Sequence, residues 1–114
     1  MAKFEEGKRY FKREEYLKAG NLFSQAISNS NKRPEYHYYR GLTFIRLEEL
    51  TSAKESLMTA YKLAPYNDEY IAQLGTVYLG LGLKTTARGI FKKALRISPD
   101  NALALEGLKN AEDD

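Results

Sequence analysis

Apolar positions along the 114-residue chain recur every three or four residues, with polar residues between them. This spacing is the period of an amphipathic α-helix that buries one face. No segment shows the competing two-residue alternation of a half-buried strand. Short turn signals separate the periodic segments, among them Asn67 and Asn101 as helix N-caps and Pro34 in a first helical turn. The pattern predicts helices over residues 2–13, 15–29, 34–47, 50–63, 67–81, 83–97 and 101–112.

The predicted helices repeat along the chain at an offset of 34 residues. One column of the repeat is Gly7, Gly41 and Gly75. Small residues in this column let paired helices approach closely, and we expect the ring of the next column to fill the space beside them. The other columns are Tyr10, Phe44 and Tyr78; Ala19, Ala53 and Ala87; Phe23, Leu57 and Phe91; and Ala26, Ala60 and Ala94, with Pro65 and Pro99 closing two of the units.

This period and these columns resemble the tetratricopeptide repeat (TPR). The resemblance implies an all-α fold, a right-handed α-solenoid of three TPR helix-turn-helix units plus a capping helix. The chain would then be a single TPR domain over residues 1–114. Repeat 1 would span about 1–33, repeat 2 residues 34–67, repeat 3 residues 68–101 and the capping helix residues 102–112. We also expect the domain to be one segment of a longer multidomain protein.

Residue types that carry catalysis are scarce in this sequence. The chain has no cysteine, which excludes disulfides, thiolate catalysis and cysteine-based zinc sites. Its single histidine, His37, has no second ligand type beside it, and we expect it to be a packing residue. The "GLGLK" stretch at 80–84 lacks the spacing of a phosphate-binding loop, so Gly80 and Gly82 are expected to shape a turn. The sequence therefore predicts no enzyme, and no catalytic, metal or cofactor site.

The net charge of +3 is small and is spread along helical faces. Basic residues near the N-terminus, such as Lys8 and Lys12, alternate with glutamates at helical spacing, which is typical of solvated helices. We expect neither a nucleic acid nor a membrane as partner, since no apolar stretch approaches the roughly twenty residues that cross a bilayer. The expected compartment is the cytoplasm. Glu6 and Arg40 interrupt an apolar column, and we predict that stacking brings them together as a partly buried ion pair.

The TPR resemblance also implies where a partner would bind, because first helices of the units line a concave surface. TPR domains that grip acidic chaperone tails carry Lys, Asn, Asn, Lys and Arg at positions equivalent to Phe4, Lys8, Tyr39, Glu69 and Gln73. Only one of these five residues is a cation, and another has reversed charge. The resemblance therefore argues against docking of a chaperone tail.

The same concave face collects apolar residues with a basic edge. We predict a protein–protein interaction module that binds a peptide or helical segment of a partner carrying apolar anchors and an acidic residue. Phe4, Phe11 and Tyr38 would line one wall, with Tyr38 a groove ring rather than a core ring. For Leu42 and Ile45, packing against their own neighbours is an equal alternative. A structural element that self-associates through an apolar face is the alternative function. The predicted groove residues are Phe4, Lys8, Phe11, Lys12, Tyr38, Tyr39, Leu42, Ile45, Arg46, Gln73 and Leu79.

Overall fold

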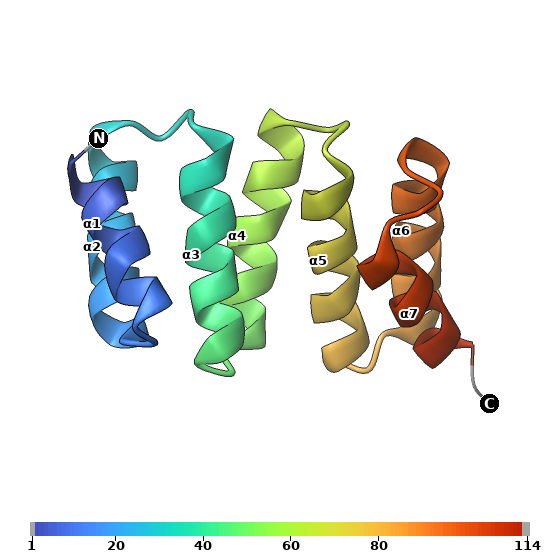
Figure 1. The fold of residues 1–114 in the computed structure, drawn as a ribbon. Coiled ribbons are helices and arrows are strands. Elements are labelled where there is room, and N and C mark those ends of the chain that lie inside the picture. The colour runs from blue at the N-terminus through green and yellow to red at the C-terminus, as the bar shows by residue number, and fades with distance from the viewer. Residues whose placement is uncertain (1, 113–114) are drawn as a thin grey trace.

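The computed structural model describes residues 2–112, and all the regular structure in this range is helical (Figure 1). The fold is the predicted α-solenoid of helix-turn-helix units with a capping helix. Every helix expected from the sequence is present, with ends within two residues of the expected ones. The helices are α1 (Ala2–Lys12), α2 (Tyr16–Asn29), α3 (Pro34–Arg46), α4 (Leu50–Leu63), α5 (Asp68–Gly80), α6 (Lys84–Ile97) and α7 (Ala102–Ala111).

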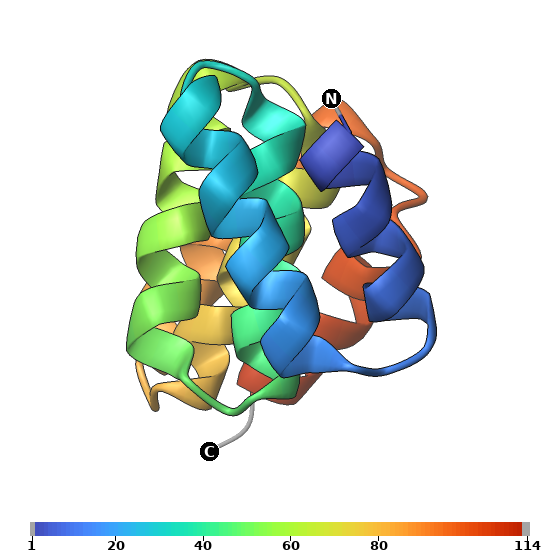
Figure 2. The ribbon, with the colours of Figure 1, turned by 90° about the vertical axis from the view of Figure 1, so that its left-hand side faces the viewer.

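The helices form two layers, with α1, α3, α5 and α7 in one and α2, α4 and α6 in the other (Figures 1 and 2). Each helix packs against the next along the chain, and α1 with α3, α3 with α5 and α5 with α7 are also in contact. Among residues 2–112, no two even-numbered helices make comparable contacts. Neighbours in the odd layer therefore lie closer together, which places the odd helices on the inner, concave side of the stack.

The glycine column marks the closest approach within each unit. A β-carbon added at Gly7 would lie 2.7 Å from the Phe23 ring, and one added at Gly41 would lie 2.7 Å from Leu57. The same construction at Gly75 reaches the Phe91 ring at 2.6 Å. The three glycines thus make equivalent helix contacts, as the 34-residue period predicts.

The residue that fills the space beside these glycines comes from the second helix of each unit. It is Phe23, Leu57 or Phe91, all three fully buried, whereas Tyr10 and its equivalents are only half-buried. The expectation that the Tyr10 column fills this space is therefore wrong. The physical reason is that a glycine faces the partner helix across the unit, while Tyr10 lies one turn farther along its own helix.

The turn inside each unit is also repeated. Glu14, Glu48 and Gly82 occupy equivalent positions and have φ angles of 64°, 60° and 83°. The residue after each of them donates its N–H to a carbonyl five residues back, as Glu49 does to Phe44 at 2.9 Å. This is the left-handed helix ending that favours glycine, and only the third unit has one there. Two glutamates therefore hold a conformation that is costly for them.

Polar side chains define two helix starts and one buried network. Asn67 accepts the N–H of Tyr70 at 3.0 Å, and Asn101 accepts that of Ala104 at 2.8 Å, as the sequence predicts for N-caps. Arg40 does not pair with Glu6. Its guanidinium donates to Ser56 Oγ at 3.2 Å and to Ser24 Oγ at 3.4 Å, on the two helices that flank α3.

The predicted ion pair between Glu6 and Arg40 is therefore wrong. The 34-residue period places the two residues on neighbouring first helices, but the Arg40 side chain extends toward the second helices α2 and α4 instead. Burial there lowers the pKa of its guanidinium, while the carboxylate of Glu55 favours the charged form.

Candidate functional site

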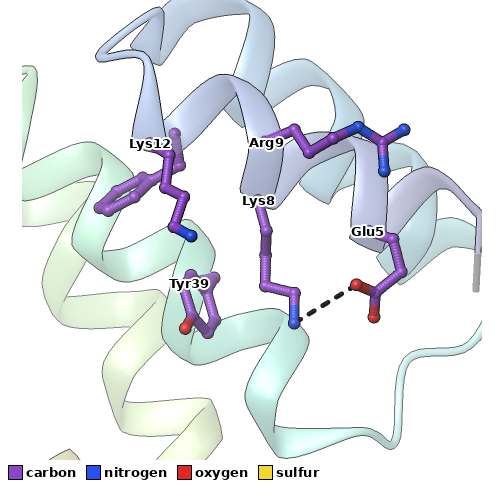
Figure 3. Close-up of a pocket in the computed structure, with 6 residues that line it drawn as sticks. Glu5, Lys8, Arg9, Lys12 and Tyr39 are labelled. Carbon is purple, nitrogen blue, oxygen red and sulfur yellow. Dashed lines mark ion pairs between the residues drawn. The ribbon is translucent and has the colours of Figure 1, made fainter.

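A cavity of about 480 Å³ opens on the concave side, between α1 and α3 (Figure 3). Each of its α1 residues lies three or four positions from another of them, so they share one helix face. Tyr39 forms the opposite wall from α3, as Figure 3 shows. The cavity is lined by Glu5, Lys8, Arg9, Phe11, Lys12 and Tyr39.

The cavity carries an excess of positive charge, because three of its lining side chains are cations and one is a carboxylate. Lys8 Nζ lies 3.5 Å from Glu5 and also sits 4.8 Å from the ring centroid of Phe4 and 5.8 Å from that of Tyr39. The ring faces therefore fix the ammonium group in place. Within residues 2–112, Arg9 and Lys12 form no ion pair, so both cations are available to an acidic group.

Tyr39 connects the cavity to the core. Its ring lies between 5.5 and 5.9 Å from four other rings. Edge-to-face contacts at this spacing hold aromatic rings in defined orientations. The half-buried Tyr39 is thus a rigid wall rather than a mobile side chain. The four neighbouring rings are those of Phe4, Phe11, Phe23 and Tyr38.

Two of the predicted groove rings belong to the core instead. Phe4 is 2% exposed because its ring packs between Phe23 and Tyr36, at centroid distances of 5.7 and 4.4 Å. Tyr38 is 8% exposed and stacks on Tyr70 of α5 at 4.5 Å. The prediction that Phe4, Phe11 and Tyr38 line one exposed wall is therefore wrong. Of the three, only the half-buried Phe11 reaches the cavity.

The remaining predicted groove residues lie on α3 and α5, outside the cavity. Leu42 and Ile45 are half-buried against the core cluster of the second unit, and Leu79 against that of the third. Arg46 is exposed at the end of α3. Gln73 is half-buried and is a hydrogen-bonding partner of the Tyr38 hydroxyl. The cavity thus gathers Lys8, Phe11, Lys12 and Tyr39 out of the predicted set.

A second cavity, of about 430 Å³, lies between α5 and α7. It includes two carboxylates and no cation, and Asp68 accepts a hydrogen bond from Asn101 Nδ2 at 2.7 Å. Glu69 is exposed and forms no ion pair within the described residues. The lining residues are Asn67, Asp68, Glu69, Ala72, Asn101, Ala102 and Leu103.

The charge of the groove therefore changes sign along its length, from positive beside α1 to negative beside α5 and α7. Burial raises the pKa of the Tyr38 hydroxyl, and the carboxylate of Glu69 raises it further, while a hydrogen bond to Gln73 opposes the shift. Burial likewise raises the pKa of Tyr70, followed by the carboxylates of Glu35 and Glu69. Burial is the main cause of both shifts, and the smaller effect of the carboxylates places negative charge near the stacked rings of α3 and α5.

Sequence reasoning missed several of the lining residues. Glu5 and Arg9 could have been found, because with Lys8 and Lys12 they complete a three-and-four spacing on one face of α1. The acidic cavity was missed since it needs Asn101 and Asp68, 33 residues apart, to meet through the stacking of α7 on α5.

Residues 2–112 give no support for metal binding, for a catalytic role of His37 or for a membrane span. No group of three or more His, Cys, Asp or Glu among residues 2–112 is placed to hold a metal ion. His37 is buried, and its Nε2 lies 2.8 Å from the carbonyl oxygen of Asn31. None of the helices in this range combines the length and apolarity of a membrane span.

Comparison with solved structures supports the fold strongly. The structure of the first TPR of Spaghetti (RPAP3) bound to HSP90 peptide SRMEEVD superposes with a TM-score of 0.93, at 20% identity, over 96% of this chain and 87% of that one. The second TPR domain of human RPAP3 in complex with HSP70 peptide SGPTIEEVD also gives 0.93, at 20% identity, over 98% and 93%. Similarity at this identity shows a shared fold.

Relatives by sequence are much longer proteins. Superkiller complex protein 3 of Homo sapiens is 31% identical over 100 residues, which cover 82% of this chain and 6% of the relative. Heat shock protein STI1 of Saccharomyces cerevisiae is 31% identical over 106 residues, covering 91% and 18%. A tetratricopeptide repeat family model matches residues 34–67 and again residues 68–101. With two consecutive units matched and the solenoid fold in place, the chain belongs to the tetratricopeptide repeat family.

Proposed function

We propose that this chain is a non-catalytic interaction module that holds a peptide or helical segment of a partner protein in its concave groove. The observation that carries the proposal is the first cavity, where the rigid rings of Tyr39 and Phe11 stand beside two cations without ion pairs, Arg9 and Lys12. A partner with an aromatic or aliphatic anchor and an adjacent carboxylate matches this combination.

The groove does not favour chaperone tails bound as the family's five-residue carboxylate clamp binds them. The two RPAP3 structures carry peptides that end in acidic EEVD sequences. In this chain, Phe4 of the equivalent clamp is buried and Glu69 is a carboxylate, so both would oppose a terminal carboxylate there. Arg9 and Lys12, farther toward the end of α1, are better placed to bind an acidic residue of the partner.

Self-association through an apolar face has less support. The most exposed large apolar side chains are Leu17 on α2, Tyr66 in the α4–α5 turn and Leu105 on α7. They come from separate elements, and single exposed apolar residues are normal on monomers. A concentration-independent monomeric mass in solution is therefore expected.

Nuclear magnetic resonance titration of the ¹⁵N-labelled chain tests the proposal. The probe is a synthetic ten-residue peptide with a central Phe-Leu pair and two adjacent Glu residues. Amide shifts are expected around Lys8, Lys12 and Tyr39. Lys12→Glu should weaken binding roughly three- to tenfold, as a rim charge does, while the matched Lys92→Glu change on α6 should not. Shifts confined to α2, α4 and α6 would refute the groove assignment.

A further inference from the structure

We propose that the groove selects a partner segment whose charges are separated, with acidic residues at the α1 end and basic residues at the α5–α7 end. This inference rests on the proposed function and adds a second determinant to it. The two cavities lie at opposite ends of one layer of helices, the first between α1 and α3 and the second between α5 and α7.

Charge complementarity determines the kind of occupant. At the α1 end, Lys8, Arg9 and Lys12 outnumber Glu5. At the α5–α7 end, Asp68 and Glu69 face no cation in the lining of the cavity. A uniformly acidic segment is attracted by the first cavity and repelled by the second, and a uniformly basic segment meets the reverse. Only a segment that carries charges of both signs, in the correct order, is attracted at both ends of the groove.

The floor between the cavities suits an uncharged stretch. Tyr38 and Tyr70 stack across α3 and α5, and Leu42 lies half-buried one turn from Tyr38. After burial, the carboxylates of Glu35 on α3 and Glu69 on α5 both raise the pKa of the Tyr70 hydroxyl. The negative potential thus begins at α3 and α5, and the transition in sign falls near the middle of the groove.

The spacing of the charges in the partner follows from the fold. The cavities are separated by about two helix spacings, roughly 16 to 20 Å at the 8–10 Å typical of packed helices. An extended chain covers this in about five or six residues at roughly 3.3 Å each. The molecule is 43 Å long, so a segment of about twelve extended residues spans the whole groove.

The experiment uses two fluorescein-labelled synthetic peptides of identical composition, with blocked ends. In the first, two Glu residues are separated from two Lys residues by five uncharged residues around a Phe-Leu centre. In the second, each Glu stands next to a Lys. Fluorescence anisotropy at about 50 mM salt, where screening is weak, measures both dissociation constants. The separated peptide is expected to bind at least about tenfold more tightly.

Variants test whether the carboxylates on α3 and α5 cause the effect. Glu69→Lys should weaken the separated peptide about tenfold and change the mixed peptide less than about twofold. The double change Glu35→Gln with Glu69→Gln removes the charges without adding cations and should give a smaller loss of the same kind. The matched control is Glu48→Lys, the same charge reversal at an exposed residue of the α3–α4 turn, which should leave the affinity of both peptides unchanged.

A benzophenone side chain placed at either end of the separated peptide reports its direction. The acidic end is expected to cross-link to α1 and the basic end to α5 or α7. Cross-links in the opposite order would overturn the inference. Equal affinity of the two peptides, with amide shifts still in the groove, would overturn the charge arrangement and leave the proposed function standing.

Two further outcomes would overturn the inference in other ways. If neither peptide binds, the proposed function fails together with it. If the chain forms a dimer that either peptide displaces, the occupant of the groove is a second copy of the chain rather than a partner segment.

Discussion

Substituting alanine at three glycines should give three different results, because each glycine is present for a different physical reason. At Gly75, an added β-carbon would lie 2.6 Å from Phe91 Cε1 and 2.8 Å from Cδ1. Carbon atoms that pack well are about 3.5 to 4.0 Å apart, so the ring must move by close to 1 Å. Its retreat toward α7 is blocked, since Gly107 also lies against this ring.

The magnitude follows from two opposing terms. Overpacking a filled core costs roughly 1 to 3 kcal/mol, while replacing glycine by alanine inside a helix returns about 1 kcal/mol. Gly75→Ala should therefore lower the free energy of unfolding by about 0 to 2 kcal/mol. Gly89 in α6 is exposed with no atom within 4 Å, so Gly89→Ala should raise it by about 1 kcal/mol. Gly82 has open space but a φ of 83°, so Gly82→Ala should lower it by about 1 kcal/mol.

Urea denaturation followed by circular dichroism measures all three variants, and an unchanged m-value shows that stability alone has changed. A double-mutant cycle identifies the contact. In a Phe91→Ala background the β-carbon at Gly75 has room, so Gly75→Ala should become stabilising, with a coupling energy of about 1 to 3 kcal/mol. If Gly75→Ala stabilises the unmodified chain as much as Gly89→Ala does, the close packing inferred at Gly75 is wrong.

Other changes test the corrected residue assignments. Tyr38→Ala should destabilise by about 2 to 4 kcal/mol in urea denaturation, because the ring is buried, and Tyr38→Phe should cost far less. The free energy of unfolding should fall as pH rises above about 10, because the pKa values of Tyr38 and Tyr70 are higher in the folded chain than in the unfolded one. Tyr38→Phe should reduce this loss, which unfolding measurements between about pH 9 and 11 would show. Arg40→Ala should lower the free energy of unfolding by roughly 1 to 3 kcal/mol, because it leaves serine hydroxyls unpaired. Glu6→Ala should change this free energy by no more than about 0.5 kcal/mol, and a double-mutant cycle should show no coupling between the two changes. Glu48→Gly should raise the thermal midpoint, with a gain of about 0.5 to 1 kcal/mol from relief of its positive φ; an unchanged midpoint would show no cost there.

The fold was predictable from the sequence because it repeats. The 34-residue columns identify equivalent positions, and the glycine column makes the same contact in every unit. The repeat period does not by itself predict how deeply a side chain is buried. Phe4 and Tyr38 are equivalent by period, and both were expected in the groove, yet each is covered by a ring from the next unit, Tyr36 or Tyr70. Burial in a solenoid depends on the neighbouring unit, because the ring that covers each position comes from that unit and not from the residue's own helix.

The direction in which a long side chain extends could not be predicted from the sequence either. The period predicts the distance between the Glu6 and Arg40 backbones but not the side of α3 toward which the guanidinium extends. Serine hydroxyls at positions 24 and 56 offer partners from α2 and α4, and hydrogen bonds to a charged donor stabilise more than neutral ones. A local hydrogen-bonding alternative therefore replaced the ion pair that the column suggested.

Differences between equivalent positions indicate where this chain carries its specificity. Columns that pack one helix against another keep small or apolar residues in all three units, because each unit must present the same surface to the next. Columns on the concave face are free of this demand, and their residues change character from unit to unit. The first unit supplies mainly cations, the second an aromatic, an aliphatic, a basic and an acidic side chain, and the third amide, hydroxyl and acidic groups. If the groove binds a partner segment as we propose, that segment must match the order of these side chains as well as their chemistry. The columns concerned are Glu5, Tyr39 and Gln73; Lys8, Leu42 and Thr76; and Lys12, Arg46 and Gly80, with Glu35 and Glu69 sharing a further column in the second and third units.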